Sequence, residues 1–122
     1  MSMPRLLIVD DDPWLRELLQ ATFPHDWYEV LEARDGLEAL GAVGARLPDL
    51  VVLDWRMPGR SGEEVLAELK QRHPALPVIV LTADGTGRPK EEAEALGADL
   101  FLTKPFSPLE LLDAVEALLP AR

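Results

Sequence analysis

The sequence predicts an α/β fold: a single domain with a doubly wound, five-stranded parallel sheet and five helices, arranged as a three-layer α/β/α sandwich. Short apolar runs alternate along the chain with helical patterns, which is the order of a repeating βα unit. Three of these runs, LLIV, LVVL and VIVL, are apolar throughout rather than at every second residue. Continuous apolar runs are typical of parallel strands that are covered by helices on both faces. The length of 122 residues suits one hydrophobic core.

The order of apolar runs places the expected strands. Their bounds are Leu6–Asp10, Tyr28–Ala33, Leu50–Asp54, Val78–Thr82 and Leu100–Thr103. Four of the five helices have a clear start signal, either an N-cap aspartate before a first-turn proline or a capping-box spacing. These signals are Asp12 with Pro13, Asp35 with Glu38, Ser61 with Glu64, and Ser107 with Glu110. The fourth helix, in DGTGRPKEEAEALG, has glycines before a late proline and few apolar residues, so we expect it to be the weakest.

Composition excludes several kinds of protein. The chain has no cysteine, so disulfides, thiolate metal sites and cysteine nucleophiles are excluded. Its formal charge of −10 argues against binding to nucleic acid or anionic membranes, because both need clustered lysine or arginine. The charge suits cations or basic partners, although acidic composition also serves solubility alone. No apolar run approaches the length of a membrane span or a secretory signal, and we expect a cytoplasmic protein.

Acidic residues gather where two strands are expected to end. Asp10, Asp11 and Asp12 lie at the end of the first strand, and Asp54 ends the third. Sites in doubly wound sheets lie at the carboxyl ends of the strands, so at least three carboxylates should converge and repel one another there. Oxygen ligands of this kind suit a hard divalent cation, Mg²⁺ or Mn²⁺. Asp12 is explained more simply as the cap of the first helix.

Two further polar residues occupy matching positions on other strands. Thr82 ends the fourth strand, and Lys104 follows the fifth. Acids, a hydroxyl, a lysine and a divalent cation are the parts needed to stabilise a transferred phosphoryl group, with a carboxylate to attack phosphorus. Taken alone, Thr82 is equally explained as a strand residue and Lys104 as a solvated one. Trp55 should point opposite to Asp54 and serve packing.

Four segments, in this order, carry a family resemblance: LLIVDDDP, VVLDWRMPGRSG, VIVLTA and FLTKPF. Together they resemble the receiver domain of two-component response regulators over essentially the whole chain, residues 1–122. The resemblance implies a flavodoxin-like fold like that of the chemotaxis regulators, with strand order 2-1-3-4-5. It also implies phosphorelay signal transduction by a phosphoacceptor whose own self-phosphorylation and autodephosphorylation are weak, rather than by an enzyme.

The same resemblance implies roles for single residues. Asp54 would be the phosphoacceptor. Asp11 would bind Mg²⁺ directly, together with Asp54 and the backbone carbonyl of Arg56, and Asp10 would support the ion through water. Lys104 would pair with Asp54 or with the incoming phosphoryl group.

Other implied roles concern the switch and its partners. Thr82 would be the switch hydroxyl and Phe101 the switch aromatic, where many members have tyrosine. Arg56 and Asp84 stand at positions that in this family influence how readily water reaches the acyl phosphate. Because they carry opposite charges, we expect them to pair across the mouth of the site and slow hydrolysis. The phosphodonor would be a sensor histidine kinase or a histidine phosphotransfer protein. The surface of the fourth helix, fifth strand and fifth helix would bind an effector or a second copy, with no nucleic acid or membrane bound directly.

Three alternative functions remain open from the sequence. A receiver-like module could act by interaction alone, but the complete set of acids, threonine and lysine argues against it. A hydrolase of the aspartyl-phosphate phosphatase type would need a second acid two residues after its nucleophile on the first strand, where Asp12 instead falls in the helix cap. A flavin-binding relative would need a phosphate-cradling loop after the first strand, and no convincing one is present.

Overall fold

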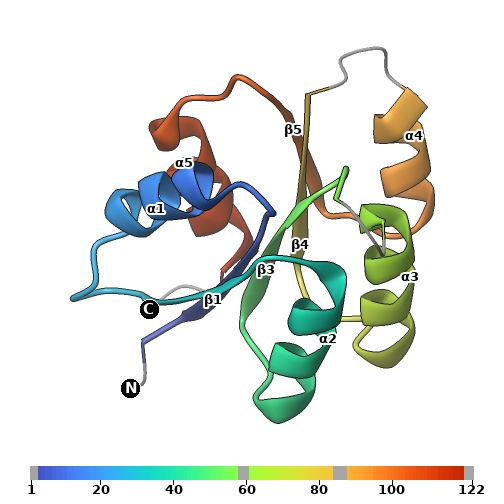
Figure 1. Ribbon diagram of the computed structural model, residues 1–122, viewed down its shortest axis with the longest axis horizontal. Coiled ribbons are helices and arrows are strands. Elements are labelled where there is room, and N and C mark those ends of the chain that lie inside the picture. The colour runs from blue at the N-terminus through green and yellow to red at the C-terminus, as the bar shows by residue number, and fades with distance from the viewer. Residues whose placement is uncertain (1–2, 58–60, 84–87, 120–122) are drawn as a thin grey trace.

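The computed structural model describes residues 3–57, 61–83 and 88–119 as five strands alternating with five helices (Figure 1). The strands are β1 (Arg5–Val9), β2 (Glu29–Ala33), β3 (Leu50–Asp54), β4 (Val78–Thr82) and β5 (Leu100–Thr103). The helices are α1 (Pro13–Thr22), α2 (Gly36–Ala45), α3 (Gly62–Arg72), α4 (Arg88–Ala95) and α5 (Pro108–Leu118). Among the described residues, no helix has the length and apolar character that crossing a membrane would require.

The strands form one parallel sheet in the order β2-β1-β3-β4-β5, which confirms the predicted doubly wound topology. Strands β3, β4 and β5 have the predicted bounds. The first strand differs from the prediction at both ends, and the second differs at its start. Arg5 belongs to β1 because it pairs with Glu29 of β2. Asp10 is outside β1 because its carboxylate accepts the amide of Asp12, so the chain turns there. Tyr28 is outside β2 because its amide bonds to the Pro24 carbonyl within the preceding turn.

Helices cover both faces of the sheet, so the domain has the three layers that the sequence predicts. Helices α1 and α5 lie on one side, and α2, α3 and α4 lie on the other (Figure 1). Alternation along β1 serves both layers: Leu6 and Ile8 belong to the core under α1 and α5, and Leu7 and Val9 belong to the core on the opposite face. The three apolar runs are therefore continuous because both of their faces are buried.

Capping explains where four of the helices begin. Asp12 accepts the amide of Trp14 at 2.9 Å, with Pro13 as the first residue of α1. The predicted caps of α2, α3 and α5 likewise accept the amide three residues later, and α5 has a complete capping box. Helix α4 is the shortest of the five described helices and buries only Pro89 and Ala93. Neither is a large aliphatic side chain such as Leu19 of α1, so α4 has little apolar material to anchor it, as the sequence predicts.

Candidate functional site

Three aspartates converge at the carboxyl edge of the sheet. Asp10 and Asp11 follow β1, and Asp54 is the last residue of the neighbouring β3. One carboxylate oxygen from each lies within 4.8 Å of the others. Asp10 and Asp54 are buried, with 1% and 5% of their surface exposed, whereas Asp11 is exposed. The structure thus brings together the three acids that the sequence placed at two strand ends.

Lys104 reaches this cluster from the other side of β4. Its backbone amide donates to the carbonyl of Thr82 at 2.6 Å, which fixes the start of the segment after β5. Its ammonium lies 3.3 Å from Asp10 Oδ2 and 3.4 Å from Asp54 Oδ1. Both contacts are longer than a tight charge-assisted hydrogen bond, so the ammonium is shared between two carboxylates.

Burial determines the charge balance of the cluster. It raises the pKa of Asp10, and burial together with the charge of Asp10 raises the pKa of Asp54 to about 6. The Lys104 ammonium opposes both shifts without cancelling them. Burial also disfavours the ammonium, but the two carboxylates outweigh this and the pKa of Lys104 is raised. One lysine is therefore too little positive charge for this set of acids.

The cluster fits a hard divalent cation. Its ligands are carboxylate oxygens, which Mg²⁺ prefers. Asp11 is exposed, so the cluster of otherwise buried acids has one side in contact with solvent. Such an ion would supply the positive charge that the raised pKa of Asp54 shows to be lacking. The residues that can hold it are Asp10, Asp11 and Asp54.

Asp12 has a different role from its neighbours, as the sequence predicted. Its carboxylate caps α1, and its amide donates to Asp10 Oδ1 at 2.9 Å. The second contact orients the buried carboxylate of Asp10. The run of three aspartates therefore contains two members of the cluster and one helix cap.

The two residues expected to form the switch lie on adjacent strands. Thr82 is buried at the end of β4. Phe101 is partly buried on β5, opposite Val80, and packs against the core under α2, α3 and α4. Because side chains alternate along a strand, Thr82 points to the same face as Val80 and Phe101.

Arg16 is a contributor that the sequence analysis did not identify. From α1, its guanidinium donates to the backbone carbonyl of Asp10 at 2.7 Å and to Glu32 on β2 at 2.9 Å. These two bonds connect the residue after β1, where the cluster begins, to α1 and to β2. An arginine in an amphipathic helix gives no sequence signal for this contact, since the contact depends on how α1 packs.

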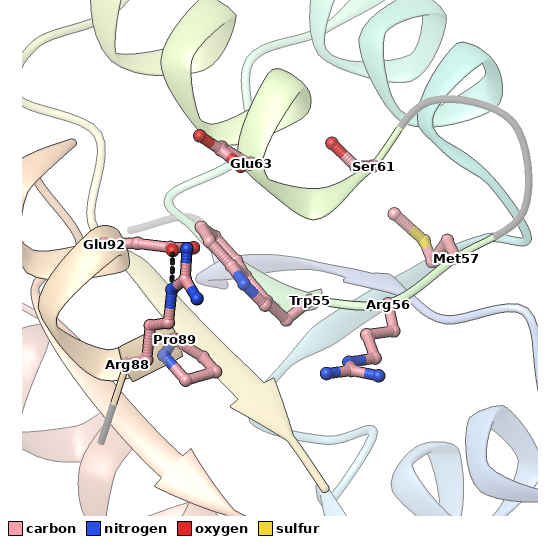
Figure 2. A pocket seen from close by; sticks show the side chains of 8 residues that line it. All are labelled: Trp55, Arg56, Met57, Ser61, Glu63, Arg88, Pro89 and Glu92. Atoms are coloured by element: carbon pink, nitrogen blue, oxygen red, sulfur yellow. Dashed lines mark hydrogen bonds and ion pairs between the residues drawn. The ribbon is translucent and has the colours of Figure 1, made fainter. Parts of the chain in front are cut away.

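A separate hollow lies between the first turns of α3 and α4. It is a cavity of about 640 Å³ whose lining includes Trp55, Met57, Ser61, Arg88 and Pro89. Figure 2 shows the indole of Trp55 between the two helices. Trp55 is 7% exposed and belongs to the core, so the prediction that it packs is confirmed.

Of the two rim residues, the structure describes one. Arg56 is exposed, and its side chain extends in a different direction from the Trp55 indole (Figure 2). Asp84 lies outside the described residues, so its pairing with Arg56 stays a prediction.

The fold and the site together define a class: a flavodoxin-like α/β domain with an acidic centre at the switch in strand order. Residues 6–116 match the family model of the response regulator receiver domain. The chain belongs to this family, as the sequence motifs indicated. Receiver domains of two-component response regulators serve as phosphoacceptors, and they interact with histidine kinases or phosphotransfer proteins.

Similar proteins support the assignment at two levels. The chain is 38% identical to sporulation initiation phosphotransferase F of Bacillus subtilis, over all of this chain and 98% of that protein. It is 40% identical to the phosphate regulon transcriptional regulatory protein PhoB of Pseudomonas aeruginosa, over 93% of this chain and 51% of the relative. The chain thus spans about half the length of that regulator.

Solved structures agree with these relatives. The chemotaxis protein CheY4 of Vibrio cholerae superposes with a TM-score of 0.90 at 32% identity, over 97% of this chain and all of that one. The receiver domain of the Francisella response regulator 1452 superposes with a TM-score of 0.88 at 35% identity, over 94% of this chain and 95% of that one.

Replacing Asp54 by asparagine should stabilise the metal-free protein at neutral pH. The folded-state pKa of about 6 lies above the reference value of 3.8, so the ionised form of Asp54 costs stability above pH 6. Removing that charge should raise the free energy of unfolding by roughly 2–3 kcal/mol. The wild type regains this stability as the pH falls from 6 towards 3.8, because Asp54 then becomes protonated in the folded state.

Urea unfolding of both proteins with a chelator present, across this pH range, measures the difference. Titrating groups outside the cluster are common to both proteins, so their contributions to the difference cancel. A difference that stays constant with pH, or a less stable asparagine variant at neutral pH, would contradict the repulsive cluster.

Proposed function

We propose that the chain is a Mg²⁺-dependent phosphoacceptor that receives a phosphoryl group on Asp54 from a sensor histidine kinase or a histidine phosphotransfer protein in the cytoplasm. One observation carries the proposal: three aspartate oxygens within 4.8 Å of one another, with a lysine ammonium 3.4 Å from Asp54. The receiver domain would be the whole chain, residues 1–122. The likeness to a phosphotransferase of nearly equal length supports a phosphorelay role.

The chain's own residues suggest how the transfer proceeds. With a pKa of about 6, Asp54 is mostly ionised at neutral pH and can act as the nucleophile. A carboxylate oxygen of Asp54 attacks phosphorus, the bond from phosphorus to the donor histidine breaks, and the imidazole keeps the electron pair and takes up a proton. Water later attacks the acyl phosphate, releasing inorganic phosphate and the free carboxylate.

The surrounding groups hold the charges of this reaction. Asp11, Asp54 and the carbonyl of Arg56 would hold Mg²⁺, with Asp10 supporting it through water. Bound Mg²⁺, or Mn²⁺ in its place, supplies positive charge to the phosphoryl oxygens. Lys104 is already within 3.4 Å of the acceptor carboxylate and can follow the added negative charge.

Mg²⁺ should raise the melting temperature of the wild type at constant ionic strength. At a free concentration of a hundred times Kd, binding adds about 2.7 kcal/mol to the free energy of unfolding. Asp11→Asn removes a member of the cluster and should reduce the shift, while Asp12→Asn keeps an N-cap and should leave it intact. Thermal unfolding of the three proteins tests this. Equal shifts in wild type and Asp11→Asn would contradict the proposed site.

Incubation with a small acyl phosphate donor and Mg²⁺ should give one labile phosphoryl adduct, located at Asp54 by intact-mass and peptide analysis. Asp54→Asn should give no adduct, and Asp12→Asn should react like the wild type.

If Arg56 slows the access of water, Arg56→Ala should lose the adduct faster than the wild type. An unchanged rate of loss would end that part of the proposal.

The same assay separates the alternatives. No adduct in the wild type supports a module that works by interaction alone. Continuous release of many phosphates per protein supports a hydrolase.

The output would be a change in the surface of α4, β5 and α5, which binds an effector or a second copy. Thr82 ends β4, the strand before α4, and points to the same face as Phe101 on β5. Helix α4 is the shortest described helix, and its two buried residues, Pro89 and Ala93, are small, so we expect it to move at low cost. The net charge of −10 argues against direct binding to nucleic acid or to an anionic membrane by this domain.

Phosphorylation should therefore change amide hydrogen exchange in α4 more than in α2. Both are surface helices on the same face of the sheet, but only α4 directly follows the threonine strand. Exchange measured by mass spectrometry with and without the phosphodonor provides the comparison, and Asp54→Asn treated in the same way is the control. A change in α4 no larger than that in α2 would contradict the proposed switch.

A further inference from the structure

Gly62 lies against the backbone of the acceptor strand. It is the first residue of α3, it is buried, and Ser61 before it caps the helix. Its amide donates to the carbonyl of Trp55 at 3.0 Å. This bond joins the start of α3 to the residue directly after Asp54, so the connection between β3 and α3 is tied at both ends.

A side chain at position 62 would have no room. A Cβ built on Gly62 would lie 2.7 Å from the carbonyl oxygen of Asp54, and 2.7 Å from both the Cα and the carbonyl oxygen of Trp55. All three are backbone atoms, which cannot rotate aside as the end of a flexible side chain can. The glycine is therefore needed for close approach. An added methyl group would move the backbone after Asp54, or the start of α3, by several tenths of an ångström.

The atoms that would move belong to the proposed reaction centre. The Asp54 carbonyl is on the same residue as the acceptor carboxylate, and the Arg56 amide donates to that carboxylate. The carbonyl of Arg56 is also one of the proposed metal ligands. The contacts of Lys104 with Asp10 and Asp54 are already 3.3 and 3.4 Å, so a further displacement weakens them quickly.

We propose that Gly62 is a positioning residue for the phosphoacceptor: the missing side chain lets α3 press on the Asp54–Trp55 backbone and hold Asp54 in register with Asp11 and Lys104. This inference rests on the function proposed above. It assigns to the start of α3 a role in metal affinity and phosphoryl transfer that is separate from helix stability.

The test compares Gly62→Ala with Gly44→Ala. Gly44 lies in α2, and a Cβ built there has nothing within 4 Å, so the chemical change is the same without the close contact. Three quantities are measured: the Mg²⁺ dissociation constant by titration, the rate of adduct formation from the small phosphodonor, and the amide chemical shifts of Trp55 and Arg56 in metal-free protein. The metal-free shifts report the backbone position without either ligand.

Gly62→Ala should raise the Mg²⁺ dissociation constant and slow adduct formation by roughly 10–100-fold, the usual effect of losing a support for a metal ligand. It should also shift the amides of Trp55 and Arg56. Gly44→Ala should stay within about twofold of the wild type. A folded Gly62→Ala protein with wild-type affinity and rate would overturn the proposal, because Gly62 would then serve packing alone.

A second, more stable variant of the protein distinguishes a loss of folding from a loss of positioning. In this protein, Gly41→Ala and Gly44→Ala replace two helical glycines that have open space around them by a better helix former, which should raise the stability of the fold. Gly62→Ala is then introduced into this more stable protein and measured again. A chain that does not fold even there would overturn the proposal, since the close approach would be a requirement of the whole fold. A wild type that neither binds Mg²⁺ nor forms an adduct would instead overturn the proposed function itself.

Discussion

The repulsion among carboxylates at one edge of the sheet is the constraint on which the rest of the site depends. Asp10 and Asp54 are buried side by side, and the single ammonium of Lys104 is shared between them. Burial keeps the pKa of both acids raised despite that contact. The fold therefore holds negative charge that is not fully balanced at the carboxyl ends of its central strands. Such a site attracts a hard cation, and it responds strongly to any further charge placed on Asp54.

The scaffold around the cluster is rigid where the charges are held. Strands β1, β3 and β4 are buried along their length, and Arg16 ties the Asp10 carbonyl to α1 and β2. The Asp10 amide donates to the carbonyl of Ala33, and Asp54 pairs with Leu81 in the ladder between β3 and β4. These backbone contacts restrict how far the two acids can move apart. Helix α4 is short and buries only two small residues, so the cost of a rearrangement is low there.

The sequence predicted the cluster but not its supports, for a physical reason. The sequence predicts that Asp10, Asp11 and Asp54 cluster, because the carboxyl ends of parallel strands in a doubly wound sheet share one edge. The helix cap at Asp12 is predictable because it is a local signal. The contact of Arg16 and the clearance at Gly62 depend on distances between elements, and neither residue type has a periodicity that reveals them. The hydrophobicity pattern predicts the start of β2 one residue too early, because it does not reveal the hydrogen bond from the Tyr28 amide to the Pro24 carbonyl in the preceding turn.

The consecutive residues Asp54 and Trp55 connect the two sides of the domain. The carboxylate of Asp54 faces the acids and Lys104, whereas the indole of Trp55 lies in the core beside the cavity between α3 and α4. The Trp55 amide also donates to the carbonyl of Leu81 at 2.8 Å, and the Lys104 amide donates to that of Thr82, the next residue. Adjacent carbonyls of β4 therefore hold the acceptor on one side and the lysine on the other. If Asp54 is phosphorylated as proposed, these two bonds connect the added charge to the end of β4, the strand that leads towards α4. This connection is the reason for proposing the output on that side of the molecule.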